Sequence, residues 1–258
     1  MFVNNFDPVA FEFFGFAIRW YSLAYIFGLV FAIQYGKYLI KNNHYFNFEP
    51  KILDDYLPFA IIGIIIGGRI GYVLFYDFQF YLANPIEIFY VWRGGMSFHG
   101  GLIGVILISI YFSKIKNLKF LIFTDLLAII TPIGLFLGRI ANFINSELIG
   151  SPSNLPWSVI FMKIDQIPRH PSQLYEAILE GLVLFLILNL IYKIKKTTGF
   201  VSASFLIFYS CFRIFAEQFR LPDEHLGYIF GLFSMGTILS LFMLSLGLIL
   251  IVNVKNNK

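Results

Sequence analysis

A group of polar side chains stands at the end of one long apolar run. There the sequence reads GRIANFINSELIG, from Gly138 to Gly150. On a helix Arg139 and Asn142 would share a face, and Glu147 follows five residues later. Such groups are costly near hydrocarbon unless each has a partner or a function. Because guanidinium groups bind phosphate oxygens in a forked geometry, this segment predicts a site for an anionic lipid headgroup.

Further ionisable residues occur within other apolar segments. Arg213 lies four residues before Glu217, so the two could be partners in catalysis or only a structural ion pair. Glu176 and Glu180 have the same spacing and could simply hydrogen-bond between helices. Arg69 could pair with a carboxylate on another helix. Ionisable groups inside a membrane are functional by default, which favours the functional interpretation for Arg213, Glu217 and Arg69, whereas the roles of Glu176 and Glu180 stay open.

His99 and Tyr21 each stand at the start of an apolar segment. No second histidine lies three or four residues from His99, so a local metal site is not expected. His99 could be a helix cap or a hydrogen-bonded structural residue, or it could accept a proton. Tyr21 follows Trp20, and such aromatic side chains ordinarily anchor a helix at the membrane surface.

The composition indicates an integral membrane protein. Of the 258 residues 58% are hydrophobic and only 13% are charged, whereas soluble domains carry about 25% charged residues. Because a spanning helix needs about 20 residues, the sequence predicts an all-α fold with seven transmembrane helices in one domain, residues 1–258. The segments lie near 18–40, 55–76, 99–113, 120–140, 172–192, 200–219 and 228–252, with outer loop segments at about 77–98 and 141–171.

The lysines predict the orientation. Eleven of the twelve follow an odd-numbered segment or lie at the C-terminus. Because lysine and arginine accumulate in cytoplasmic loops, the N-terminus is expected outside and the C-terminus inside. The polar residues described above then fall in the outer half of the bilayer. The net charge of +4 reflects this topology and the anionic inner leaflet, and it does not indicate nucleic-acid binding.

Three other features have structural interpretations. Gly63, Gly67 and Gly71 are spaced by four, which predicts close packing of one helix against another. Asp125 lies toward the inner end of its segment and is given no chemical role. Cys211 is the single cysteine, which excludes an intrachain disulfide and a cysteine metal cluster.

Together these residues resemble the prolipoprotein diacylglyceryl transferase family. The run from Gly138 to Gly150 matches the family signature G-R-x-x-N-F-x-N-x-E-x-x-G at every fixed position. Three further runs resemble other family motifs: 98–104, 169–176 and 212–220. The resemblance extends from Asp7 to the seventh segment.

The resemblance implies an enzyme of the bacterial cytoplasmic, or inner, membrane. The family moves the diacylglyceryl group of phosphatidylglycerol to the lipobox cysteine thiol of a prolipoprotein signal peptide. A thioether forms and glycerol phosphate leaves, in the first step of lipoprotein maturation. By resemblance, Arg139 binds phosphatidylglycerol and Arg213 is a second essential arginine. The other matched positions held important for activity are Tyr21, His99, Asn142, Glu147 and Gly150.

The chemistry suits the two arginines. When the carbon–oxygen bond breaks, a phosphodiester with one negative charge becomes a leaving group that develops a second. Arg139 and Arg213 would therefore bind the transition state better than the lipid. The substrate thiol, with an unperturbed pKa of about 8.5, needs a base or a nearby positive charge. His99 could take this proton, while Glu147 or Glu217 could take it instead or orient an arginine. No metal or organic cofactor is required.

Two alternatives come from other functional classes. A lipid flippase or transporter could hold phosphatidylglycerol through the same arginines, and a membrane phosphotransferase could use the same headgroup. The chain shows no symmetric halves, and its polar groups gather on one side of the membrane, which disfavours a transporter. Neither alternative would modify a prolipoprotein thiol.

Overall fold

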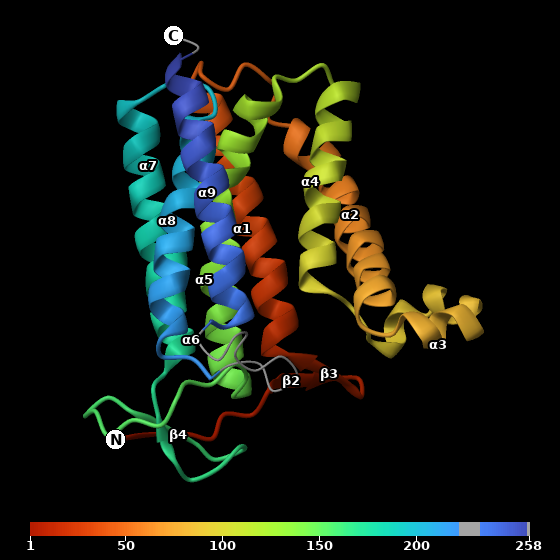
Figure 1. The fold of residues 1–258 in the computed structure, drawn as a ribbon, viewed down its shortest axis with the longest axis vertical. Coiled ribbons are helices and arrows are strands. Elements are labelled where there is room, and N and C mark those ends of the chain that lie inside the picture. Colours follow the sequence, from red (N-terminus) through yellow and green to blue (C-terminus); the bar gives the residue numbers. More distant parts are fainter. Residues whose placement is uncertain (222–232, 257–258) are drawn as a thin grey trace. The chain divides into compact units, whose positions relative to one another are not determined.

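The computed structural model describes residues 1–221 and 233–256, apart from the side chains of Phe98, Lys255 and Asn256. The chain divides into two compact units, each described by itself (Figure 1). The first unit consists of Met1–Gly36 and Asp125–Lys258, and the second consists of Lys37–Thr124. The single domain expected from the sequence stays a prediction.

Helices dominate both units. Within the described residues, six helices are long and apolar enough to cross a membrane, and a seventh apolar helix, α4 (Phe98–Ile115), is shorter. These helices support a membrane protein with several spans. The six are α1 (Trp20–Asn42), α2 (Ile52–Phe75), α5 (Phe120–Asn145), the continuous helix Ser172–Ile194, α8 (Phe200–Glu217) and α9 (Met235–Asn256).

The helix ends differ from the prediction in two places. Helix α5 was expected to end near residue 140 but continues to Asn145, so the first residues of the expected outer loop are helical. It ends in a Schellman-type turn, in which Ser146 N–H donates to Phe143 O at 3.2 Å and Glu147 N–H to Asn142 O at 2.9 Å. The last segment was expected from residue 228. Residues 228–232 lie outside the described residues, and α9 begins at Met235.

In the second unit, α2 and α4 pack through glycines. A Cβ added to Gly67 would lie 2.4 Å from Gly100 O, and one added to Gly104 would lie 2.0 Å from Gly63 O. Neither distance is tolerable for a real side chain, so the two backbones approach more closely than any larger residue would permit. The close packing predicted from the glycine spacing is confirmed.

Arg69 of α2 has different partners from those expected. Its guanidinium donates to main-chain carbonyls, at 2.8 Å to Ile88 O and at 2.6 Å to Gly94 O. These acceptors are carbonyl oxygens and differ from the carboxylate on another helix that the sequence left possible. Further carbonyl acceptors are those of Glu87, Tyr90 and Gly95. Arg69 thereby holds the segment after α2 in place. That segment contains α3 (Phe78–Ala83) and two 3-10 helices, η1 (Pro85–Phe89) and η2 (Val91–Arg93).

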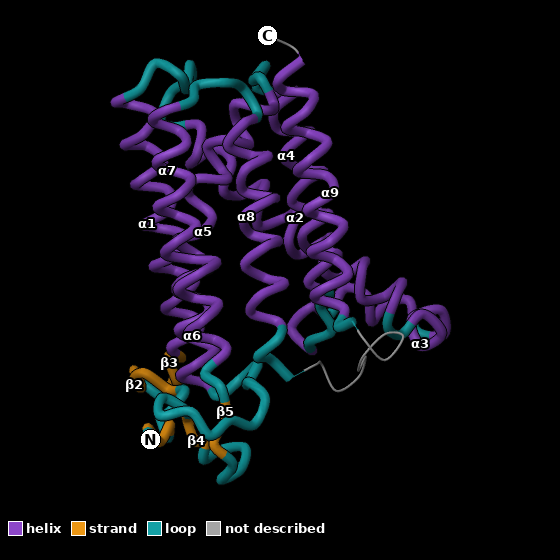
Figure 2. Tube along the Cα trace, turned by 60° about the vertical axis from the view of Figure 1, so that its left-hand side comes forward, coloured by secondary structure: helices purple, strands orange, loops and turns teal. Residues whose placement is uncertain are grey.

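Five short strands were not expected from an all-α prediction. In the first unit, β1 (Phe2–Asn4) pairs in parallel with β4 (Val159–Phe161), and β4 pairs antiparallel with β5 (Pro168–Arg169). A separate hairpin, β2 (Val9–Phe13) and β3 (Phe16–Arg19), leads directly into α1. Figure 2 shows the strands gathered at the end of the unit where the helix from Ser172 begins. Such short strands carry too few residues for an alternating pattern to be recognised.

The three-stranded sheet supports the end of α5. Phe143 packs in a small buried cluster with Val159 and Phe161 of β4. The fully buried Asn4 of β1 donates its side-chain amide to Phe143 O at 2.6 Å. The N-terminal strand is therefore bonded to the helix end that carries the signature residues.

Asp125, which received no chemical role, joins α5 to the start of α8. Its carboxylate is fully buried and accepts hydrogen bonds at 2.7 Å from Gly199 N–H, Ser202 N–H and the Ser202 hydroxyl. The first N–H groups of a helix have no partner within the helix. Asp125 satisfies two of them from a neighbouring helix.

We expect Asp125→Ala to lower the free energy of unfolding by about 1–3 kcal/mol, because hydrogen bonds to a charged group are lost and buried N–H groups become unsatisfied. Thermal unfolding in detergent measures the change. The control is Asp54→Ala, since Asp54 is half exposed and pairs with Lys37 at 2.7 Å near the surface. That pair should contribute no more than about 1 kcal/mol. Equal effects of both substitutions would contradict the capping role.

Candidate functional site

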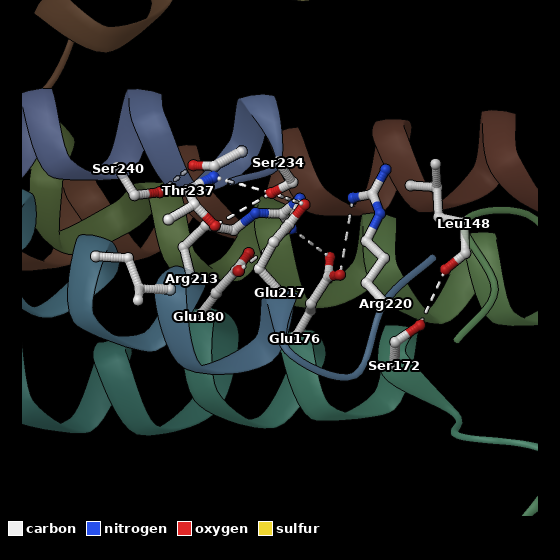
Figure 3. Close-up of polar contacts among 12 residues, drawn as sticks. Leu148, Ser172, Glu176, Glu180, Arg213, Glu217, Arg220, Ser234, Thr237 and Ser240 are labelled. Carbon is white, nitrogen blue, oxygen red and sulfur yellow. Dashed lines mark hydrogen bonds and ion pairs between the residues drawn. The ribbon is translucent and has the colours of Figure 1, made fainter. Parts of the chain in front are cut away.

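Three arginines and three glutamates meet in the first unit, and all of them except Arg139 are labelled in Figure 3. We call them the charge cluster. Helix α5 supplies one, the helix from Ser172 supplies two, and α8 with the residues after it supplies three. The members are Arg139, Glu176, Glu180, Arg213, Glu217 and Arg220.

Glu176 lies at the centre of the charge cluster. Its Oε2 is 2.7 Å from Arg139 Nε and 2.8 Å from Arg213 Nη1. Its Oε1 is 3.8 Å from Arg220 Nη1, and the residue is fully buried. These contacts are ion pairs by distance without the alignment of good hydrogen bonds. One carboxylate thus holds together three cations from two helices and the segment after α8.

The other two glutamates are held differently. Glu217 Oε2 is 2.8 Å from Arg213 Nη2, and its Oε1 accepts a hydrogen bond from the Ser234 hydroxyl at 2.9 Å. Glu180 has only longer contacts, 3.4 Å to Arg139 Nη2 and 3.5 Å to Arg213 Nη1. Arg213 consequently contacts all three glutamates of the charge cluster.

The helix from Ser172 presents Glu176 and Glu180 to the arginines. It consists of α6 (Ser172–Glu176), a π-helical segment η3 (Ala177–Val183) and α7 (Leu184–Ile194). π-Helical turns are rare and occur frequently at functional sites. At Gly181 an added Cβ would lie 2.6 Å from Phe136 Cβ, so this glycine lets the helix approach α5 closely. The close approach brings the two glutamates to Arg139.

The signature residues after Arg139 form a hydrogen-bonded turn. Asn142, which is buried, donates its side-chain amide to Glu147 Oε2 at 2.9 Å, and Asn145 donates to Glu147 Oε1 at 3.2 Å. Ser146 and Leu148 have left-handed backbone conformations, with φ of 60° and 54°. Such conformations are uncommon for residues with a side chain and are held here by the surrounding bonds. Asn142 and Glu147 therefore shape the turn that follows Arg139.

Gly150 joins the end of the signature to the end of α8. It forms a bridge with Arg220, and Leu221 N–H donates to Ile149 O at 3.1 Å. A Cβ added to Gly150 would lie 2.2 Å from His170 O. The absence of a side chain at Gly150 therefore permits the close approach of the His170 backbone.

Arg169, from a motif quoted above, supports the same glycine. Its guanidinium donates to Gly150 O at 3.3 Å and to Asp165 Oδ2 at 2.5 Å. The Arg169 guanidinium lowers the pKa of the Asp165 carboxyl, and burial lowers the pKa of the neighbouring His170. We interpret Asp165 and Arg169 as a support for the Gly150 backbone.

Tyr21 and His99 are not members of the charge cluster. The Tyr21 hydroxyl lies 3.3 Å from that of Tyr25, and the two rings are 5.0 Å apart. His99 lies on α4, in the second unit. Ser97 is the N-cap of α4 and accepts from Gly100 N–H at 3.2 Å, so the interpretation of His99 as the cap is wrong. Its role as a base stays a prediction.

Three cluster residues were not assigned a role from the sequence. Glu176 and Glu180 were left open, and Arg220 appeared only as the last residue of a motif. One signal was present, because two carboxylates four residues apart within an apolar helix are expensive without cations nearby. For Arg220 the seven-residue spacing from Arg213 was available, since positions seven apart fall on one helix face. Within the described residues, no group of histidine, cysteine or carboxylate side chains is arranged to hold a metal ion.

Comparison with known proteins agrees with the motifs. The model of the prolipoprotein diacylglyceryl transferase family matches residues 8–253. Three curated relatives, each 47% identical, are named phosphatidylglycerol–prolipoprotein diacylglyceryl transferase. That of Nitrosospira multiformis aligns over 95% of this chain and 86% of its own length, that of Bordetella avium over 96% and 94%, and that of Rickettsia felis over 96% and 96%.

Proposed function

Because the chain belongs to the prolipoprotein diacylglyceryl transferase family and is a transferase, we propose that it moves the diacylglyceryl group of phosphatidylglycerol to the lipobox cysteine of prolipoproteins. A carbon–sulfur bond forms, the carbon–oxygen bond to phosphate breaks, and glycerol phosphate leaves with the electron pair. The buried charge cluster beside the signature turn is the observation that carries this proposal.

Arg139 and Arg213 bind the phosphate in this proposal. Both are fixed by Glu176, and Arg213 is also fixed by Glu217, so their guanidinium groups are oriented before substrate arrives. Preorganised cations aimed at developing charge are among the largest contributions to catalysis. Asn142, Glu147 and Gly150 act by holding the backbone after Arg139.

The nucleophile belongs to the substrate, and its proton must leave before or during attack. We assign His99 as the proton acceptor, because an imidazole side chain can take a proton from a nucleophile in general-base catalysis. Glu217 orients Arg213, as the 2.8 Å contact supports. Tyr21 belongs with the lipid-facing part of the site near the start of α1.

His99→Gln tests the proton acceptor. If His99 is the base, phosphatidylglycerol binding should persist and turnover should fall, with a loss that shrinks as the pH rises toward the thiol pKa of about 8.5. The measurement is the pH–rate profile of each protein, with lipid binding determined separately. A defect of equal size at every pH, accompanied by lower thermal stability, would indicate a structural role instead.

The overall activity is tested with purified protein, phosphatidylglycerol nanodiscs and a lipobox peptide. Mass spectrometry should show a peptide heavier by one diacylglyceryl group, in a linkage that resists mild alkali as a thioether does. A peptide with serine in place of the lipobox cysteine should remain unmodified. Lipid transport or headgroup transfer without peptide modification would refute the proposal.

We also propose seven spans in the bacterial cytoplasmic membrane, with the N-terminus and the active site toward the outer face. The lysine distribution supports this orientation. Tags at residue 2 and at residue 258 should be labelled from opposite sides, the first from outside and the second from inside. Labelling of both tags from one side would require an even number of spans.

A further inference from the structure

The arginines proposed to bind phosphate are already occupied by carboxylates. Arg213 directs Nη1 at Glu176 and Glu180 and directs Nη2 at Glu217. Arg139 directs Nε at Glu176 and Nη2 at Glu180. Within the described residues, the remaining nitrogen of Arg139, Nη1, has no such contact, and the Arg139 side chain is the most exposed of the three arginines at 16%. An anion therefore has access to the charge cluster at Arg139.

The formal charges of the cluster already cancel. Three guanidinium groups face three carboxylates, all largely enclosed among apolar helices. A phosphodiester with one negative charge would leave this cluster with one uncompensated negative charge. Such a charge is expensive in a poorly solvated interior, and a titratable group usually becomes neutral instead.

Glu180 is the carboxylate whose charge is held most weakly. Its ion-pair distances are 3.4 and 3.5 Å, whereas the shortest contacts of Glu176 and Glu217 are 2.7 and 2.8 Å. Glu217 also accepts a hydrogen bond from Ser234, and Glu176 has a third arginine within 3.8 Å. Glu180 is fully buried, so water does not compensate for its longer contacts.

We propose that binding of the phosphatidylglycerol phosphate is coupled to the uptake of one proton by Glu180. The charged and titratable groups that face Glu180 are Arg139 of α5, Arg213 and Tyr209 of α8, and Glu176 of its own helix. Both arginines stay charged, and the incoming phosphate adds a negative charge to the same arginines. The proton comes from solvent and turns the carboxylate into a carboxylic acid, so the arginines are released to the lipid. This inference rests on the proposed function and concerns the free energy of lipid binding.

The affinity for the lipid should therefore depend on pH. Uptake of a proton on binding means that binding tightens as the pH falls, by up to about tenfold in Kd for each pH unit while Glu180 is charged in the free protein. Glu180→Gln carries a permanently neutral side chain of similar size. The variant should bind at pH 8 at least about fivefold more tightly than the wild type, within the limit of about tenfold per pH unit. A residue with only a structural role would weaken binding when replaced.

The test uses isothermal titration of dihexanoylphosphatidylglycerol into the full-length protein in detergent. Titrations at pH 7 in two buffers of different ionisation enthalpy, neither of them a phosphate, count the protons taken up. The wild type should take up close to one proton and Glu180→Gln close to none, because one group titrates in the first and is absent in the second. Asp125→Asn is the matched control: it neutralises another fully buried carboxylate, on α5, and should still take up close to one proton.

Three results would overturn the inference. The wild type could bind the lipid without proton uptake, Glu180→Gln could take up the same number of protons, or His99→Gln could abolish the uptake. The first is decisive even if Glu180→Gln does not fold. In each case formation of the thioether would leave the proposed function intact, whereas failure to bind phosphatidylglycerol or to modify the peptide would contradict the proposed function itself.

Discussion

Arg139→Ala and Arg213→Ala should each lower turnover by at least about 10²-fold, the usual loss when one preorganised donor to developing negative charge is removed. Both arginines contact Glu176, at 2.7 and 2.8 Å, so each is held in place before the lipid arrives. The measurement is the rate of peptide modification with saturating phosphatidylglycerol. Arg93→Ala is the control, because Arg93 is exposed and pairs with Glu87.

A second substitution separates charge from geometry. Arg139→Lys retains the positive charge but cannot make two parallel contacts to one phosphate, so it should restore little of the lost activity. It should also lose one of the contacts to Glu176 or Glu180, since a single ammonium replaces the Nε and Nη2 donors. Near-normal turnover of a well-folded Arg139→Ala protein would rule out the assignment of Arg139 as a phosphate ligand.

Glu176→Gln should be among the most destabilising single substitutions in the chain. The buried carboxylate faces Arg139, Arg213 and Arg220, and its removal leaves the charge cluster with an uncompensated positive charge. Removing one partner of a buried ion pair costs about 3–5 kcal/mol. For a chain of this size that corresponds to a decrease in Tm of roughly 6 to 20 °C. Thermal unfolding of purified protein in detergent measures it.

The control for this prediction is Glu87→Gln in the second unit. Glu87 pairs with Arg93 at 2.6 Å, a shorter distance than any in the charge cluster, but the Arg93 side chain is 59% exposed. Surface pairs contribute about 0–1 kcal/mol because water solvates both charges. Glu180→Gln should fall between the two, since its contacts are longer. If Glu176→Gln and Glu87→Gln changed the Tm equally, burial would not be what makes Glu176 important.

Several features of the protein could be predicted from the sequence because they depend on composition or on short spacing. The high hydrophobic content identifies the membrane as the solvent, and segments of about 20 residues locate the helices within a few residues. The four-residue spacing of Arg213 and Glu217 allowed an ion pair, and the two side chains lie 2.8 Å apart. The glycine spacing in α2 predicted the close packing with α4. Residues three or four apart on a helix are neighbours whatever the rest of the fold does.

The motif run from Gly138 to Gly150 led to the family, which the comparisons confirm. The run could not show how its residues act together. Helix α5 continues five residues beyond its expected end and closes in a strained turn. This turn brings the Asn142 side-chain amide to the Glu147 carboxylate. Gly150 is required by the backbone of His170, from another part of the chain. Where a helix ends depends on which partners satisfy its last carbonyls, and these partners are not visible in local spacing.

Only the tertiary structure decided which charges meet. Arg139 is 41 residues from Glu180, and Arg213 is 33 residues from the same glutamate. Arg69 could have faced a carboxylate and instead binds main-chain carbonyls of the segment after α2. A helical sequence determines which residues share a face. Which helix that face meets depends on packing between segments that are far apart in the chain. In this protein the close approach at Gly181 and the π-helical turn around it bring two buried carboxylates to the arginines.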